Sequence, residues 1–208
     1  MRAAFTRSPW ACSARAAAAV LLATTVTACG QMQRQGEGSS YLIVNALDGS
    51  AGNDTTFAGV LHSDVLTVVD NVPTVFNDQG RVRMVLAMKD PGGTGSPTKP
   101  TTANYVTISQ YHVRFIRADG RNTPGVDVPY AFDGGMTMTV GPSEVSGTFN
   151  LVRHIAKDEA PLRALASNGV IISTIAEVTF YGHDQTGREV SATANISVDF
   201  GNFGDKTS

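Results

Sequence analysis

The chain has 208 residues, two cysteines and a formal net charge of −2, and 42% of its residues are hydrophobic. A chain of this length can bury one full hydrophobic core. It has no basic stripe and no interleaving of aromatic with basic residues, which argues against a nucleic-acid partner.

The start of the chain has the three-part pattern of an export signal. Arg2, Arg7 and Arg15 make it basic, and it contains no acidic residue. Residues 16–28 then carry no charge, and small residues precede Cys29. This order of basic, apolar and small residues is typical of a secretory signal peptide, here residues 1–28. The apolar stretch is shorter than the roughly 20 residues that span a bilayer, which argues against a permanent transmembrane helix.

The stretch Val26-Thr27-Ala28-Cys29-Gly30 resembles the lipobox of bacterial lipoproteins. In that family the cysteine thiol receives a diacylglycerol, the signal is cut just before it, and the new amino terminus is usually acylated too. The resemblance implies that Cys29 is the site of lipid attachment and the first residue of the mature chain. Each buried CH₂ contributes about 0.8 kcal/mol, so more than one acyl chain makes anchoring stable. Gly30 stands where an Asp would signal retention, which in enteric bacteria favours the outer membrane.

Two other interpretations of the leader stay open. An acid-free leader that contains Arg, Ala and Ser also resembles an organelle transit peptide, and a plain secretory signal can precede an incidental cysteine. Cleavage before Cys29 leaves 180 residues with 13 basic and 18 acidic side chains, a charge of −5. It also leaves Cys29 as the only cysteine, so the exported chain has no internal disulfide and no Cys₄ zinc site.

Residues 29–39 are rich in Gln, Gly and Ser and are predicted to form a flexible tether. A domain at 40–203 and a short C-terminal tail at 204–208 follow. Within the domain, β-branched and aromatic residues and period-two alternation predict strands, and turn-forming residues predict loops. The predicted strand regions are 40–47, 60–69, 81–88, 105–117, 126–132, 136–140, 147–155, 170–181 and 188–200, and the predicted loops include 48–54 and 90–102.

The clearest pattern lies near the end of the chain. Within 188–200, the eleven residues 190–200 alternate strictly between apolar and polar side chains, which is typical of a strand with one face in water. The β-prone stretch 170–181 precedes it, and turn-forming residues at 183–187 join the two, which predicts a long antiparallel hairpin. One short connector helix is predicted at 158–167, because Pro161 suits a first helical turn.

The sequence therefore predicts an all-β fold, a single antiparallel β-sandwich with long loops and one short connector helix. Residues 178–190 resemble the final hairpin of bacterial immunoglobulin-like sandwich domains, in which an Asp-x-x-Gly turn joins the last two strands. That resemblance implies an immunoglobulin-like topology. The whole chain resembles uncharacterised bacterial lipoproteins, a likeness that implies no activity.

Motifs for catalysis are missing from the sequence. No Gly-x-Ser-x-Gly nucleophile elbow occurs, and the glycine-rich stretch 92–96 lacks the Gly-Lys-Ser/Thr ending of a phosphate-binding loop. The sequence predicts no enzyme, no cofactor and no metal site, and an enzyme with a dispersed active site would need a pocket that holds a His and a carboxylate. The four histidines, which follow no metal-ligand spacing, are His62, His112, His154 and His183.

Ligand binding is a separate possibility that two kinds of side chain raise. Calcium takes six to eight oxygen ligands, and loops of β-sandwiches often supply them. We expect most of the aromatic side chains named below to belong to the core, because the chain has few aromatics to fill one. Three or more of them exposed on one face would instead floor a sugar-binding site. The oxygen-rich clusters are Asp48, Ser50, Asn53 and Asp54, and Asp119, Asn122, Asp127 and Asp133; the aromatic set is Tyr105, Tyr111, Phe115, Tyr130 and Phe132.

The expected function is a non-enzymatic, lipid-anchored protein of the bacterial cell envelope that acts as a structural or interaction module. Its partners are expected to be the membrane, through the lipid on Cys29, and an envelope protein or a glycan. The alternative is a surface lipoprotein that binds a glycan or calcium.

Overall fold

The computed structural model describes residues 38–52 and 54–203. Contacts divide the chain into two compact units, residues 1–38 and 39–208, and all of the described strands lie in the second. The predicted signal peptide, Cys29, nearly all of the tether and the C-terminal tail lie outside the described residues. Among the residues that are described, no helix is long and apolar enough to cross a membrane.

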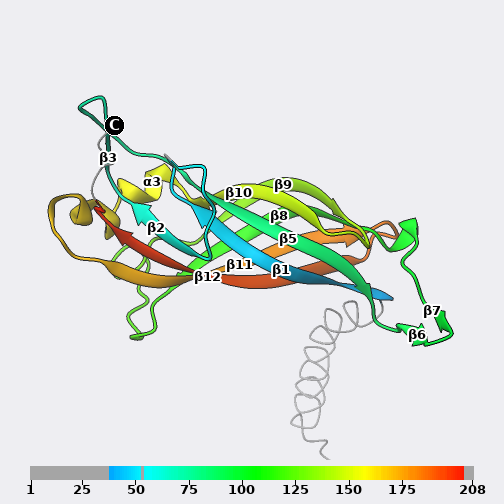
Figure 1. The fold of residues 1–208 in the computed structure, drawn as a ribbon. Helices are drawn as coiled ribbons and strands as arrows, with labels where there is room; N and C mark the ends of the chain where they lie inside the picture. The colour runs from blue at the N-terminus through cyan, green and yellow to red at the C-terminus, as the bar shows by residue number, and fades with distance from the viewer. Residues whose placement is uncertain (1–37, 53, 204–208) are drawn as a thin grey trace, which may run out of the picture. The chain divides into compact units, whose positions relative to one another are not determined.

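Two β-sheets form the body of the second unit (Figure 1). One sheet has three strands in the order β1-β5-β10, and the other has five in the order β2-β12-β11-β8-β9. Two small hairpins, β3–β4 and β6–β7, lie outside these sheets. The strands are β1 Ser40–Ser50, β2 Val60–Asp64, β3 Thr67–Val69, β4 Val72–Thr74, β5 Asp78–Met88, β6 Gly92–Gly93, β7 Ser96–Pro97, β8 Val106–Ile116, β9 Phe132–Val140, β10 Val145–Val152, β11 Ile172–Asp184 and β12 Glu189–Gly201.

The helical elements are short and connect strands. They are the 3₁₀ helix η1 at Thr102–Asn104, the α-helix α3 at His154–Lys157 and the 3₁₀ helix η2 at Leu162–Ser167. The predicted single helix at 158–167 is therefore wrong in its bounds, because the helical residues form two pieces on either side of Pro161. A proline disfavours helical backbone in the residue before it, which separates the two pieces.

Period-two alternation explains why the two sheets pack face to face. In β5 and β11, alternate side chains are buried along almost the whole strand, as expected for sheets with one face in the core. Phe149 of β10 joins the layers, since its ring centroid lies 4.8 Å from that of Tyr111 on β8 and 5.3 Å from that of Phe180 on β11. The core of the sandwich thus lies between the three-stranded and the five-stranded sheet.

The predicted all-β sandwich with long loops is confirmed, with one departure from antiparallel pairing. β2 pairs with β12 in parallel, so that Leu61 lies opposite Val198. β1, β5 and β10 pair antiparallel throughout, as do β12, β11, β8 and β9. β2 is a short strand at the edge of the five-stranded sheet, where it pairs with β12, the last strand of the chain.

Two further predictions about the elements are wrong. The region 126–132 is not a strand: Pro124 and Val128 form an isolated bridge, and β9 begins only at Phe132. Pro129 lacks a backbone N–H, which prevents regular pairing there. The predicted loop at 48–54 begins later than expected, because β1 continues to Ser50 and its last residues pair with β5.

The predicted long hairpin at the end of the chain is confirmed. β11 and β12 pair antiparallel from Ile172 opposite Phe200 to His183 opposite Glu189. The carboxylate of Asp184 accepts hydrogen bonds from the backbone N–H groups of Thr186 and Arg188, at 2.8 and 2.9 Å, and closes the turn. This turn fixes the register of the two strands, and the register decides which side chains face outward.

At Gly182, β11 lies very close to the backbone of β8. A Cβ at this position would overlap the backbone carbonyl of Thr107 and lie 2.9 Å from the Cα of Ile108, beside a register shift in the pairing. We therefore expect Gly182→Ala to lower the free energy of unfolding by about 1–3 kcal/mol or more, as overpacking against backbone does. Gly169→Ala, where nothing lies within 4 Å, serves as the control and is expected to change little in urea denaturation. Equal effects of the two substitutions would contradict this packing.

Candidate functional site

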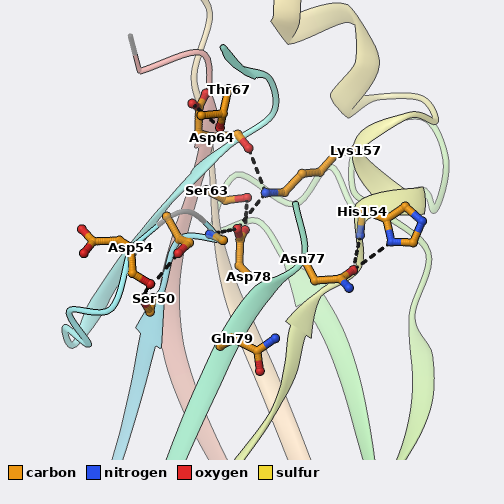
Figure 2. Close-up of polar contacts among 12 residues, drawn as sticks. Ser50, Asp54, Ser63, Asp64, Thr67, Asn77, Asp78, Gln79, His154 and Lys157 are labelled. Carbon is orange, nitrogen blue, oxygen red and sulfur yellow. Dashed lines mark hydrogen bonds and ion pairs between the residues drawn. The ribbon is translucent and has the colours of Figure 1, made fainter. Parts of the chain in front are cut away.

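Three polar side chains with no access to water meet at one end of the sandwich (Figure 2). They are Ser63 of β2, Asp78 of β5 and Lys157 of α3, and their exposed fractions are 0%, 0% and 2%. We call Ser63, Asp78 and Lys157 the buried polar cluster. Because an unpaired charge inside a protein is costly, a fully buried Lys and Asp require each other.

Local structure places each member of the buried polar cluster. Ser63 and Asp78 occupy inward positions of the alternating strands β2 and β5. Lys157 is the last residue of α3, and the side-chain oxygen of Asn77 accepts hydrogen bonds from the backbone N–H and ring Nδ1 of His154, at 2.7 and 3.0 Å. The adjacent residues Asn77 and Asp78 thus hold the two ends of α3.

The hydrogen bonds of the cluster satisfy both charged groups. Nζ of Lys157 donates to Oδ1 of Asp78 at 2.7 Å and to the backbone carbonyl of Asp64 at 2.8 Å. Oδ2 of Asp78 accepts from the hydroxyl of Ser63 at 2.6 Å, and Oδ1 also accepts from the N–H of Gly52 at 3.0 Å. The pair therefore ties together β2, β5, α3 and the turn after β1.

Burial sets the protonation behaviour of Asp78. Burial raises the pKa of Asp78 above its ordinary value, and the charge of Lys157 together with the hydrogen bonds from Lys157, Ser63 and Gly52 offsets only part of that rise. The protonated carboxyl is therefore tolerated better at this place than in water. The ionised form depends on Lys157.

The chemistry open to the buried polar cluster is limited. Its serine hydroxyl donates to a carboxylate, and no histidine hydrogen-bonds to that hydroxyl, so the contacts are not those of an activated nucleophile. Its members have almost no contact with solvent, and a substrate needs to reach the reacting atoms. The arrangement acts as an internal clamp that holds α3 against the sandwich.

The predicted histidines do not come together. Nδ1 of His112 lies 2.8 Å from Oδ1 of Asp133, and Nδ1 of His62 lies 3.5 Å from Oδ2 of Asp199. His154 contacts Asn77, and His183 is exposed near the end of β11. Within residues 38–52 and 54–203, no group of three or more His, Cys, Asp or Glu side chains is placed to hold a metal ion.

The two oxygen-rich clusters are directed to other partners. Asp48 pairs with Arg81 at 2.9 Å, and Asp119 pairs with Arg117 and Arg121, each at 2.7 Å. Hydrogen bonds from these two arginines hold the pKa of Asp119 well below its usual range. Asp133 contacts His112, and the other described members contact residues of their own turns; these are Ser50, Asp54, Asn122 and Asp127. Asn53 lies outside the described residues.

The expectation that most of the five aromatic residues belong to the core is confirmed. Tyr111, Phe115 and Phe132 are buried and belong to the core, and Tyr105 is partly buried against it. Of the five, Tyr130 alone is more than half exposed, at 54%. The position of a residue in the alternation of its strand, and not its type, decides whether it faces inward.

Two hollows lined by described residues lie on the surface, and neither has the lining of an active site. One lies beside Arg114, Asn122 and Pro129, and the other beside Tyr41, Lys89 and Pro97. Neither lining includes a histidine or a carboxylate. They therefore do not supply the acid–base pair that the enzyme interpretation requires.

Sequence reasoning missed the buried polar cluster, although part of its signal was present. The alternation recognised at Val82, Met84 and Leu86 continues backwards to Gly80 and Asp78 in the same inward phase. An acidic residue in the apolar phase of a strand needs a buried partner. The identity of that partner, 79 positions further along the chain, is not visible in any local pattern.

Comparison with known proteins gives no relative: no family model, no curated protein and no solved structure matches the chain. The immunoglobulin-like topology and the lipoprotein assignment therefore stay predictions. Arguments about function rest on the sequence and on the geometry described above.

The clamp can be tested by removing its cation. We expect Lys157→Met to lower the free energy of unfolding by about 3–5 kcal/mol at pH 7, because it leaves the carboxylate of Asp78 buried and uncompensated. Adding Asp78→Asn to that variant is expected to restore most of the loss, since the charge is then absent. Urea denaturation of the full chain measures both effects.

The exposed ion pair between Arg114 and Glu177, at 2.8 Å, provides the control for the Lys157 variant. Arg114→Met is expected to change stability by no more than about 1 kcal/mol, as is usual for surface pairs. A double variant of Lys157 and Asp78 that is no more stable than Lys157→Met alone would contradict the clamp.

The pH dependence of the Lys157→Met variant follows from the raised pKa of Asp78. The folded state holds the proton of Asp78 at pH values where the unfolded chain, with its ordinary value of 3.8, has released it. The contribution of this group to stability is therefore greatest below that value, and it falls as the pH rises through the folded pKa. Removing Lys157 raises the folded pKa further, so we expect the variant's deficit relative to wild type to be smaller at pH 5 than at pH 8. A deficit that grows on acidification would refute this.

Proposed function

We propose that the chain is a non-enzymatic, lipid-anchored protein of the bacterial cell envelope and acts there as a structural or interaction module. The observation that carries the proposal is the leader, in which a basic start and an uncharged stretch end at Val26-Thr27-Ala28-Cys29. The acyl groups on Cys29 would hold the protein to the bilayer. In this proposal Gly30 favours the outer membrane.

The described domain is compatible with a role in binding. The one buried cluster of charged and hydroxyl groups that we find in the described residues is sealed from solvent, and it stabilises α3. β3 and α3 lie at the same end of the sandwich (Figure 1), and the N–H of Phe203 contacts Asp64, next to β3, at 3.4 Å. Several apolar side chains are exposed on β3, β4, α3 and the segments beside them: Val68, Val69, Val72, Ile155, Val170, Ile171 and Phe203. Exposed apolar side chains that gather in one place commonly mark interaction surfaces.

The proposal predicts that Cys29 decides membrane attachment. We expect Cys29→Ser to move the protein from the detergent phase to the aqueous phase in a phase-partition experiment on cells, because the acyl chains are lost. Cys12→Ser removes the other cysteine, which lies within the leader, and is expected to leave partitioning unchanged. Mass spectrometry of the wild-type protein is expected to show an acylated Cys29 at the amino terminus.

A bare thiol at Cys29, on a protein that salt removes from membranes, would refute the anchor. A wild-type chain that keeps residues 1–28 would point to a different use of the leader. Release of the folded domain by Cys12→Ser as well would show that neither cysteine is specific.

A further inference from the structure

The outer face of the five-stranded sheet carries the outward side chains of β2, β12, β11, β8 and β9. On β11, Phe180 and Val178 point into the core, while Thr179, Tyr181 and His183 take the outward phase. The same alternation runs through β12 and β8. Along these strands the outward side chains are exposed or half-buried.

One ion pair joins fixed charges of opposite sign on this face, and its other carboxylates lie beside or opposite histidines. Nη2 of Arg114 lies 2.8 Å from Oε1 of Glu177, on neighbouring strands. His112 contacts Asp133 at 2.8 Å and His62 contacts Asp199 at 3.5 Å. At the turn end, His183 stands directly opposite Glu189. With the histidines neutral, as in the formal charge at pH 7, Asp133, Asp199 and Glu189 give this face more carboxylates than fixed cations, which disfavours an anionic partner.

Hydroxyl and amide groups occupy most of the remaining outward positions. Two cross-strand threonine pairs join their hydroxyls: Thr179 with Thr193 at 3.0 Å and Thr107 with Thr139 at 3.1 Å. In each pair one hydrogen is shared, so one hydroxyl hydrogen and several lone pairs stay available to a ligand. The pairs are held by the strand register and need little ordering on binding.

Tyr181 lies between these two hydroxyl pairs. In the register it stands opposite Gln110 of β8 on one side and opposite Ser191 of β12 on the other. Its side chain is 43% exposed, on a strand whose other aromatic, Phe180, is fully buried. An exposed aromatic ring thus lies towards the hairpin-turn end of the face, with an amide and a hydroxyl opposite it on the neighbouring strands.

We propose that this face, centred on Tyr181, binds an uncharged polysaccharide. The ring of Tyr181 would pack against the apolar C–H face of a pyranose, while Gln110 and the threonine pairs would exchange hydrogen bonds with its hydroxyls. The surplus of carboxylates favours a neutral chain over an anionic one. This inference names the partner of the interaction module proposed above, and it rests on that role but not on the lipid.

The test is affinity electrophoresis of the full chain, in mild detergent, through gels that contain dextran, mannan, glucomannan, hydroxyethyl cellulose or heparin. We expect retardation by at least one of the four neutral polymers, and a loss of at least tenfold in affinity for it in Tyr181→Ala. Tyr181→Phe keeps the ring and is expected to bind within about threefold of wild type. Thr193→Val removes a hydroxyl and is expected to cost about two- to tenfold, the usual range for one hydrogen bond.

Tyr41 of β1 provides a matched control, because it is 44% exposed and belongs to the other sheet. Tyr41→Ala is expected to bind like wild type. No retardation by any neutral polymer, or equal losses from Tyr41→Ala and Tyr181→Ala, would overturn the proposal. Retardation by heparin alone, abolished by salt, would overturn it in favour of an anionic partner. Cys29→Ser is expected to bind the neutral polymer unchanged, so failure of the anchor and failure of this face are separate results.

Discussion

The ion pair between Lys157 and Asp78 is the interaction on which the end of the sandwich depends. It joins a four-residue helix to two strands of different sheets and to the turn after β1, through groups that water does not reach. Such a pair adds little net stability, because desolvation of both charges opposes their attraction. Its effect is selective: any arrangement that separates the two leaves a charge buried alone. The pair therefore specifies where α3 lies more than how stable the domain is.

This selectivity matters because the rest of α3 has little to hold it. A helix of one turn is not stable by itself, and its backbone groups need partners from elsewhere. Asn77 accepts a hydrogen bond from the backbone N–H of His154, and Asp78 accepts one from the side-chain Nζ of Lys157. Asn77, just before β5, and Asp78, its first residue, thus hold both ends of this short helix.

Period-two alternation and β-prone composition made most of the fold predictable from sequence. Alternation identified β5 and β12, and β-branched and aromatic residues identified β8 and β11. The alternation, followed in phase, also places Asp78 inward and Tyr181 outward. Residue type alone does not give the phase, since Tyr111 and Phe115 face the core whereas Tyr181 faces outward. What no local pattern contains is the pairing of distant segments, such as Lys157 with Asp78 or the parallel approach of β2 to β12.

The buried polar cluster and Tyr181 lie towards opposite ends of the long strands of the sandwich. β1 begins at Ser40 and runs 11 residues to Ser50, a length of about 35 Å for extended chain, and the turn that follows it contacts Asp78. The chain thus enters the sandwich at the end opposite the buried polar cluster. Tyr181 lies towards the hairpin turn of β11 and β12, away from the end where Phe203 contacts Asp64. A change that loosens the clamp therefore acts at a distance from Tyr181, whereas the His62–Asp199 end of the outer face adjoins Ser63. The paired register of β8, β11 and β12 keeps the Tyr181 end in place.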